Sequence, residues 1–105
     1  MRSIRSDSVA VIFVSQRSGC EAGYSAAALA MEEEAARQPG YLGMHSVRGE
    51  DGFGITISYW TDEASALAWR DHPGHAAIRE LGRARWYDSY EIIVSQVTRA
   101  YSWPA

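Results

Sequence analysis

Hydrophobic and polar positions change their spacing several times along the chain, and each change predicts an element. Residues 9–14, VAVIFV, are apolar at every position, which is typical of a strand covered on both faces. Residues 53–60, FGITISYW, alternate between apolar and polar side chains, and residues 42–48 form a plausible strand before them. An Asp-Gly turn at residues 50–52 predicts a hairpin between these two strands. A long last strand is predicted over residues 89–99.

The first helix is predicted between the first two strands. The segment Ser18–Glu21 matches a capping box, and Pro39-Gly40 ends the helical pattern after about Gln38. Five residues on one stripe of this helix are predicted to face the core: Tyr24, Ala27, Ala28, Met31 and Ala35.

The second helix is predicted to begin after a cap at Thr61 or Asp62 and to be interrupted by Pro73-Gly74. A second helical piece then runs to about Arg83. The core stripe of the first piece is predicted to consist of Ala64, Leu67 and Ala68. Trp69 lies off that stripe, so it is expected either to plug the gap between helix and sheet or to form a pocket wall.

The predicted order of strand, helix, strand, strand, helix, strand is that of the α+β ferredoxin-like βαββαβ unit. Such a unit has a four-stranded antiparallel sheet with both helices on one face. We expect a single domain over residues 1–105, with short tails at residues 1–7 and 100–105. Because the first strand is apolar on both sides, the second face of the sheet needs a cover. A second copy of the chain is the simplest cover, so we predict a homodimer.

The composition excludes several classes of function. The net charge is −3 and the basic side chains are scattered among acids, which argues against nucleic-acid binding. The longest apolar run is too short to span a bilayer, and the first residues lack the apolar stretch of a signal peptide, so no membrane association and a cytoplasmic location are expected. Cys20 is the only cysteine, so no internal disulfide can form, and we expect it to be a bystander thiol.

The chemistry-bearing side chains gather in residues 58–90, which hold three of the four tryptophans, two of the three histidines and four arginines. Aromatic walls with a few polar groups are typical of small-molecule pockets. His72 and His75 could share a metal, but Pro73 separates them and no third ligand stands at a recognisable spacing, so no metal site is predicted. A helix-end role or a proton-transfer role is favoured for both histidines.

Arg79 and Arg83 are four residues apart on one helical face and could hold a carboxylate or an enolate. Salt bridges with neighbouring acids are the alternative for either arginine. No Ser-His-Asp order, glycine-rich phosphate loop or paired-carboxylate motif is present, so hydrolase and nucleotide-binding functions have no support.

Three groups of residues carry a resemblance to a known family: Tyr59-Trp60; Ala68-Trp69-Arg70-x-His72-Pro73-x-His75; and Gly82-Arg83-x-x-Trp86-x-x-x-Tyr90. With them, the chain resembles the antibiotic biosynthesis monooxygenase (ABM) family from Val9 to Tyr101. The resemblance implies a dimeric α+β barrel with a pocket between the helices and the sheet of each subunit. It also implies one of two activities: oxidation of polycyclic phenols or anthrones by O₂ without metal or flavin, or binding and degradation of haem.

The function expected from this resemblance is a cofactor-independent monooxygenase that acts on a small polycyclic or phenolic aromatic. The base would be His75 or His72, and Arg79 or Arg83 would steady the anion. Trp69 and Trp86 would form the aromatic walls, and Trp69 is also predicted to be a catalytic residue together with the two histidines. Phe13 and Tyr59 are predicted to contact the substrate as well. The partners expected are a small aromatic substrate and a second copy of the chain.

Three alternatives stay open. Haem could be a substrate or a ligand: Trp69 matches the tryptophan of the haem-degrading branch, whereas Arg79 stands near the position of its iron-ligating histidine, and Ser15 or Gln16 near that of its asparagine. A non-catalytic binder of a flat hydrophobic ligand would need the same walls but no base. A structural dimer whose aromatic cluster is all packing would have no cavity at all.

Overall fold

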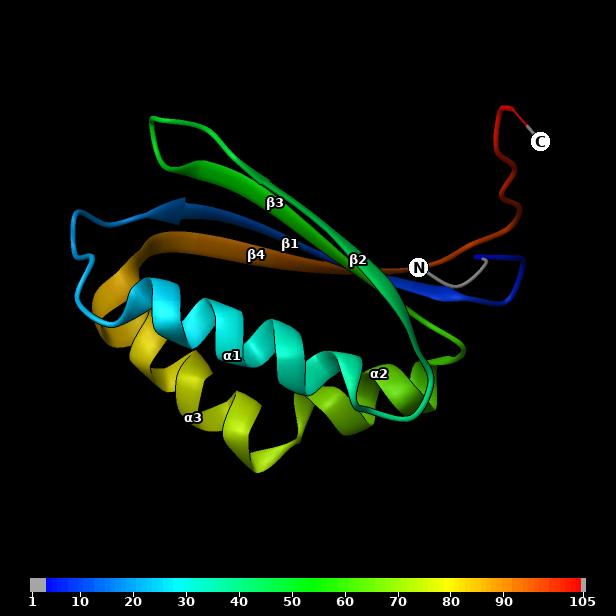
Figure 1. Cartoon of the computed structure of the whole chain (residues 1–105), viewed down its shortest axis with the longest axis horizontal. Helices are drawn as coiled ribbons and strands as arrows, with labels where there is room; N and C mark the ends of the chain where they lie inside the picture. The colour runs from blue at the N-terminus through cyan, green and yellow to red at the C-terminus, as the bar shows by residue number, and fades with distance from the viewer. Residues whose placement is uncertain (1–3, 105) are drawn as a thin grey trace.

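The computed structural model of the chain describes residues 4–104 and has the predicted order of elements. These are β1 (Val9–Arg17), α1 (Tyr24–Ala36), β2 (Tyr41–Arg48), β3 (Phe53–Trp60), α2 (Glu63–Arg70), α3 (Pro73–Leu81), a π-helical turn η1 (Gly82–Trp86) and β4 (Tyr87–Gln96). The strands form one antiparallel sheet in the order β2-β3-β1-β4, and the helices cover one of its faces (Figure 1). The ferredoxin-like prediction is confirmed. None of the described helices is both long and apolar enough to cross a membrane.

The residues at the boundaries of the helices act largely as predicted. Asp62 caps α2, since its carboxylate accepts a hydrogen bond from the amide of Ser65 at 2.8 Å. The helix breaks before Pro73, and the ring of His72 caps the next piece by accepting from the amide of Gly74 at 3.1 Å. Gly40 has φ 84° and lies so close to Ser65 that a Cβ there would come within 2.2 Å of the serine hydroxyl.

The predicted capping box does not form. The first helix begins only at Tyr24, behind Gly23 in the left-handed region. The hydroxyl of Ser18 accepts from the amide of Cys20 at 3.1 Å and donates to the carbonyl of Arg85 at 2.6 Å, which ties this loop to η1 instead. Glu21 lies 3.6 Å from the guanidinium of Arg17.

The predicted core stripe of α2 was wrong. Ala66 and Trp69 are its buried residues, whereas Ala64, Leu67 and Ala68 are exposed. A short helix of eight residues presents only two turns to the sheet. The large indole of Trp69 gains more from burial than Leu67, because buried apolar area scales with side-chain size.

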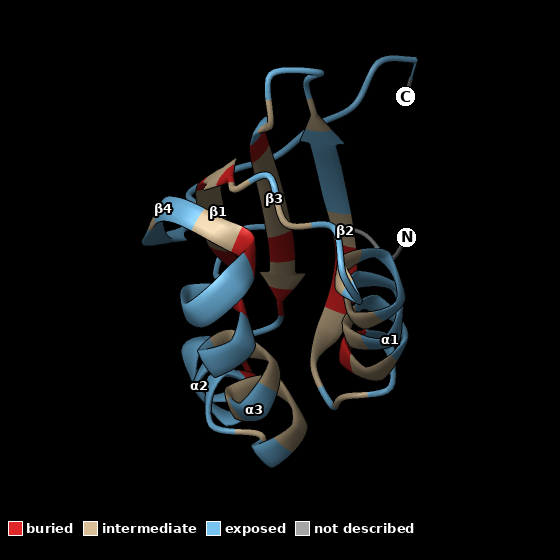
Figure 2. Ribbon diagram, turned by 90° about the vertical axis from the view of Figure 1, so that its left-hand side faces the viewer, coloured by how far each residue is buried: buried red, intermediate tan, exposed pale blue. Residues whose placement is uncertain are grey.

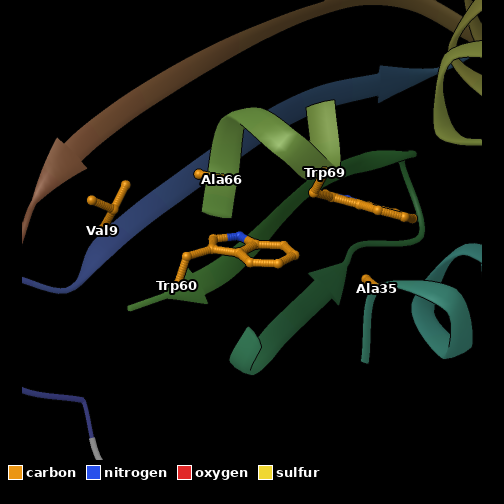
Figure 3. Close-up of a cluster of buried hydrophobic side chains, with 5 residues drawn as sticks. All are labelled: Val9, Ala35, Trp60, Ala66 and Trp69. Carbon is orange, nitrogen blue, oxygen red and sulfur yellow. The ribbon is translucent and has the colours of Figure 1, made fainter. Parts of the chain in front are cut away.

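The core sits at one end of the sheet. Its buried members are Val9, Ala35, Trp60, Ala66 and Trp69, drawn as sticks in Figure 3. The indoles of Trp60 and Trp69 stack with ring centroids 6.4 Å apart, and the ring N–H of Trp60 donates to the hydroxyl of Ser58 at 2.9 Å. Beyond this cluster, α1 stands on one side and α2 with α3 on the other beneath the sheet (Figure 2).

The first helix is only loosely anchored to the sheet. Ala35 is its only buried residue. Tyr24 and Met31 are half-buried, and Leu29 is 57% exposed. A methyl group contributes little buried apolar area. The helix is therefore held to the sheet by one small side chain and a few partial contacts.

The two faces of the sheet differ in polarity along β2 and β3. On the face toward the helices, β2 and β3 present Ser46, Thr56 and Ser58. The face away from the helices carries apolar side chains from all four strands: Ala10, Ile12, Val14, Val47, Phe53, Ile55, Ile57, Tyr59 and Ile93. Val47 is 72% exposed and Ile93 is 45% exposed. The helix side therefore has a polar strip along β2 and β3, whereas the outer side exposes a contiguous apolar surface.

Candidate functional site

A cavity of about 490 Å³ lies between the three helices and the inner face of the sheet. That volume is in the range of small-molecule sites. Its lining falls into three groups: a Trp69-His75-Arg79 wall from α2 and α3, an aromatic end where η1 meets β4, and a floor from the sheet. A cavity of this size excludes the possibility that the aromatic cluster is all packing.

Trp69 and His75 form the wall next to the core. Their rings stack with centroids 4.5 Å apart and 9° between the planes, while Nδ1 of His75 lies 3.0 Å from the carbonyl oxygen of Trp69. The helix break before Pro73 makes this stacking possible, because a separate helix α3 can place His75 against the indole of Trp69. Trp69 is both a core residue and a pocket wall, the two roles that the sequence left open.

The protonation of His75 follows from its hydrogen bond. A carbonyl oxygen only accepts, so Nδ1 carries the hydrogen, and Nε2 of the neutral ring is left with a free lone pair. Burial lowers the pKa of His75 below its ordinary value, and the electrostatic effects of Arg79 and His72 lower it further, against the opposing hydrogen bond to Trp69. His75 is thus a neutral imidazole at pH 7 with one nitrogen able to take a proton.

Arg79 adds a positive charge to the same wall. Its Nη1 donates to the carbonyl oxygen of Arg70 at 3.0 Å, which pins the side chain across the α2–α3 junction. Among the described residues, no carboxylate lies within salt-bridge distance of Arg79, whereas Arg70 is paired with Asp71 at 2.9 Å. An unpaired guanidinium beside a neutral imidazole can stabilise an anion formed by proton removal.

The far end of the cavity is built from aromatic rings. Phe13 on β1 packs against Tyr87 at 5.2 Å and Tyr90 at 5.3 Å between centroids, and Trp86 meets Tyr24 of α1 at 5.9 Å. The π-helical turn brings Trp86 inward, where its ring N–H donates to the carbonyl of Ala22 at 2.9 Å. Burial raises the pKa of Tyr87, with a hydrogen bond to Tyr24 acting in the same direction, so this phenol stays protonated at any ordinary pH.

The floor is polar along β2 and β3 and apolar along β1 and β4. The hydroxyls of Ser46 and Thr56 are 2.6 Å apart, and Arg48 lies next to them along β2. The apolar half consists of Val11, Phe13, Ile92 and Val94. A ligand on this floor would meet hydroxyls under one edge and hydrocarbon under the other.

Five of the eight predicted site residues come together around this cavity: Trp69, His75, Arg79, Trp86 and Phe13. The other three do not line it. His72 caps α3 and lies 3.4 Å from the carboxylate of Glu34 on α1. Arg83 donates to the hydroxyl of Tyr90 at 2.6 Å and pairs with Glu80 at 3.1 Å.

Tyr59 is the third predicted residue outside the cavity. It lies on the outer face of the sheet, because side chains along β3 alternate between faces and its neighbours Ser58 and Trp60 point inward. There its hydroxyl lies 3.0 Å from Nδ1 of His45. Tyr59 is left out of the site proposed below.

The sequence analysis missed the tyrosines and the polar floor. Tyr24 was placed in the core, Tyr87 received no role, and Tyr90 was named only within the resemblance. Thr56 and Ser58 were seen only as the polar half of an alternating strand. The shared period of two in β2 and β3 sets Ser46 opposite Thr56 and Arg48 opposite Gly54, which groups these residues on one face without saying that this face meets the helices.

A second hollow, of about 410 Å³, lies beside Val9 and the start of α2 and shares Glu63 and Val94 with the first cavity. Its polar lining includes Asp7, Asp62 and Glu63, with no aromatic ring from the described part of the chain. Asp62 is engaged there in capping α2. Residues 4–104 contain no group of three or more His, Cys, Asp or Glu side chains that could hold a metal ion.

Residues 8–81 match the model of the family described as antibiotic biosynthesis monooxygenase. The chain belongs to this family. It is also 48% identical over 90 residues to the uncharacterized protein YqjZ of Bacillus subtilis (strain 168), a match that covers 86% of this chain and 79% of that protein. The family resemblance inferred from the aromatic and histidine motifs is therefore confirmed.

Two solved structures resemble most of the chain. SnoaB from Streptomyces nogalater, described as a cofactor-independent oxygenase, aligns with a TM-score of 0.72 at 21% identity, covering 94% of this chain and 99% of SnoaB. Rv0793 from Mycobacterium tuberculosis aligns with a TM-score of 0.78 at 14% identity, covering 90% of this chain and 99% of Rv0793. At these identities the likeness establishes the fold.

Proposed function

We propose that this chain is a cofactor-independent monooxygenase that oxidises a small, electron-rich polycyclic or phenolic aromatic with O₂. The observation that carries the proposal is the neutral His75, stacked on Trp69 in a cavity wall with an unprotonated Nε2. Membership of the ABM family and the fold shared with SnoaB, a cofactor-independent oxygenase, support the reaction class.

The reaction starts with a proton transfer. Nε2 of His75 takes a proton from an acidic C–H or O–H of the substrate, such as the methylene group of an anthrone. The resulting enolate passes one electron to O₂, and the radical pair combines to a peroxide anion. This anion takes the proton back from His75 and becomes a hydroperoxide. Loss of water from the hydroperoxide leaves a carbonyl, so CH₂ and O₂ become C=O and H₂O.

The other walls act on charge and orientation. Arg79 lines the same cavity as His75, so its fixed positive charge lies near the negative charge that forms when the proton leaves and lowers the barrier to its formation. Trp69, Trp86 and Phe13 hold the flat substrate between aromatic faces. Burial keeps His75 in its basic form near neutral pH.

The proposed assembly is a homodimer that joins the outer faces of two sheets. Ile12 and Ile57 are register partners at the centre of that face, with Val47 and Ile93 toward its edges. Contiguous apolar surface of this kind is uncommon on monomers and marks an interface. Two copies related by a two-fold axis would cover each other with the same surface.

An oxygen electrode tests the proposed reaction. Purified protein is mixed with anthrone, with buffer and His75→Gln as the two controls, and the product is followed by the absorbance of anthraquinone. We expect oxygen uptake that requires His75 and is unchanged after treatment with a chelator. Uptake equal to that of the buffer blank over a panel of anthrones and phenols would contradict the proposal.

A hemin titration separates the rival function. Arg79 stands where the haem-degrading branch has its iron-ligating histidine, and arginine does not ligate iron in this way. We expect no saturable Soret shift. A sharp, saturating shift that decays with ascorbate in the presence of catalase would establish haem degradation instead.

A further inference from the structure

Arg48 lies on the floor of the cavity, at the end of β2, in a position with no assigned role in the proposed reaction. It is half-buried and lines the cavity beside Ser46, Thr56 and Tyr87. Its guanidinium carbon is 5.9 Å from the ring centroid of Tyr87. A charged group in this setting needs either a partner or contact with solvent.

No carboxylate within the described chain lies at salt-bridge distance from Arg48, although Arg17, Arg37, Arg70 and Arg83 each have one. Its hydrogen bonds go to neutral oxygens: Nη1 donates to the carbonyls of Gly52 at 2.6 Å and Ser15 at 3.5 Å, and Nη2 donates to the hydroxyl of Ser15 at 2.8 Å. These bonds fix the guanidinium in place and leave its charge unbalanced.

Donors remain free on the same group. A guanidinium has five N–H groups, and the three bonds to Ser15 and Gly52 use three of them, so two have no partner among the described residues. One of the two is the N–H of Nε. No side-chain nitrogen or oxygen in the described chain is buried without a hydrogen-bond partner, so Nε of Arg48 lies against accessible space.

The neighbouring strand makes room for this guanidinium. Gly54 pairs with both Arg48 and Ser15 in the sheet, and a Cβ on Gly54 would lie 2.7 Å from the guanidinium carbon and 2.9 Å from Nη1. The backbone of Gly54 does not have positive φ, so its conformation does not demand glycine. The missing side chain instead lets the guanidinium lie directly on the floor.

We propose that the ligand of this cavity is an aromatic carboxylate, with its rings between the aromatic walls and its carboxylate on Arg48, beside the hydroxyls of Ser46 and Thr56. The carboxylate would supply the missing counter-charge and take the free N–H groups. A purely structural role for Arg48, in bracing the β2–β3 hairpin, would explain its bonds to Ser15 and Gly52. It would not explain why the charge of Arg48 is unpaired or why Arg48 lines the cavity. This proposal rests on the proposed function in one respect only: both assume that the substrate binds in this cavity.

A matched pair of ligands tests the charge directly. Naphthoate and naphthamide share their rings and differ in charge at neutral pH, and their binding can be followed by quenching of tryptophan fluorescence, since Trp69 and Trp86 line the cavity. We expect naphthoate to bind the wild-type protein about tenfold more tightly, the effect of a charge-assisted hydrogen bond. Equal dissociation constants for the two ligands would overturn the proposal.

Variants show which residue causes the preference for naphthoate over naphthamide. In Arg48→Gln the preference for naphthoate is expected to disappear while naphthamide binding stays the same, and Arg85→Gln, exposed and outside the cavity lining, is expected to keep the preference. Gly54→Ala retains the charge but displaces the guanidinium, so it is expected to weaken naphthoate binding selectively. Gly54→Ala also provides the test if Arg48→Gln does not fold. A preference retained in both Arg48→Gln and Gly54→Ala would overturn the assignment.

The outcome is independent of turnover. If naphthoate is preferred and the preference depends on Arg48, but no anthrone or phenol consumes oxygen, the carboxylate subsite stands and the oxygenase proposal fails. If oxygen is consumed but the preference is absent, the subsite fails and the oxygenase proposal stands.

Discussion

His75 is hydrogen-bonded to the residue on which it stacks: its Nδ1 lies 3.0 Å from the carbonyl oxygen of Trp69, and its ring lies 4.5 Å from the indole. One residue therefore fixes both the tilt and the tautomer of the imidazole. The nitrogen that remains free is determined before any ligand enters, which is the preorganisation that a general base needs.

Replacement of His75 by glutamine is expected to lower turnover by about 100-fold or more, because the amide can hydrogen-bond but cannot take a proton. Ligand affinity is expected to change little. Steady-state oxygen uptake and fluorescence titration measure the two effects separately. His72→Gln is the matched control, since His72 lies outside the cavity lining, and an equal loss in that variant would contradict the assignment of the base to His75.

The pH dependence of stability gives a second test of His75. Burial lowers its pKa below the ordinary value of 6.5. Above pH 6.5 the ring is neutral in both the folded and the unfolded chain. As the pH falls below 6.5, the unfolded chain takes up the proton first, so the free energy of unfolding decreases until the folded pKa is reached. Urea denaturation between about pH 7.5 and 5 is expected to show this decrease, and His75→Gln to reduce it.

Trp69→Ala is expected to lower the free energy of unfolding by about 3–5 kcal/mol, since it removes a buried indole from the core. Trp69→Phe keeps an aromatic face and is expected to cost less while still weakening ligand binding. Thermal and urea unfolding measure the stability change. Trp103, which is 93% exposed, supplies the control: Trp103→Ala is expected to stay within about 0.5 kcal/mol of the wild type.

A charge at the centre of the outer sheet face is expected to dissociate the proposed dimer. Ile57→Glu would place an unpaired carboxylate against the apolar side chains of the second copy. Sedimentation velocity is expected to give a dimer for the wild type and for Leu29→Glu, on the exposed side of α1, and a monomer for Ile57→Glu. A monomeric wild type would rule out the homodimer.

The order of elements was predictable because turn residues mark nearly every boundary. Pro39-Gly40, the Asp51-Gly52 turn and Pro73 each end or separate an element where expected. The start of α1 was not predictable from Ser18, because its hydroxyl is used by the carbonyl of Arg85, far away in sequence. A local capping motif cannot reveal a competitor from the other end of the chain.

The parts of the site that depend on residue type could be predicted from the sequence. The parts that depend on which way a strand side chain points could not. Large aromatic and basic residues in residues 58–90 indicated a pocket, and Trp69, His75, Arg79 and Trp86 line one. The inward direction of Thr56 and Ser58 could not be derived, since alternation defines two faces without saying which one meets the helices. Apolar residues normally face the helices, and only in the middle of β2 and β3 do polar residues face the cavity instead.

The single buried alanine of α1 has a consequence for motion. A helix held by so little apolar contact can leave the sheet at a small cost in free energy, so its amides are expected to exchange with solvent faster than those of β1. A ligand that fills the cavity lies against Tyr24, Ala28 and Met31 and supplies the contacts that the helix lacks. Ligand binding is therefore expected to slow the amide exchange of α1 more than that of β1.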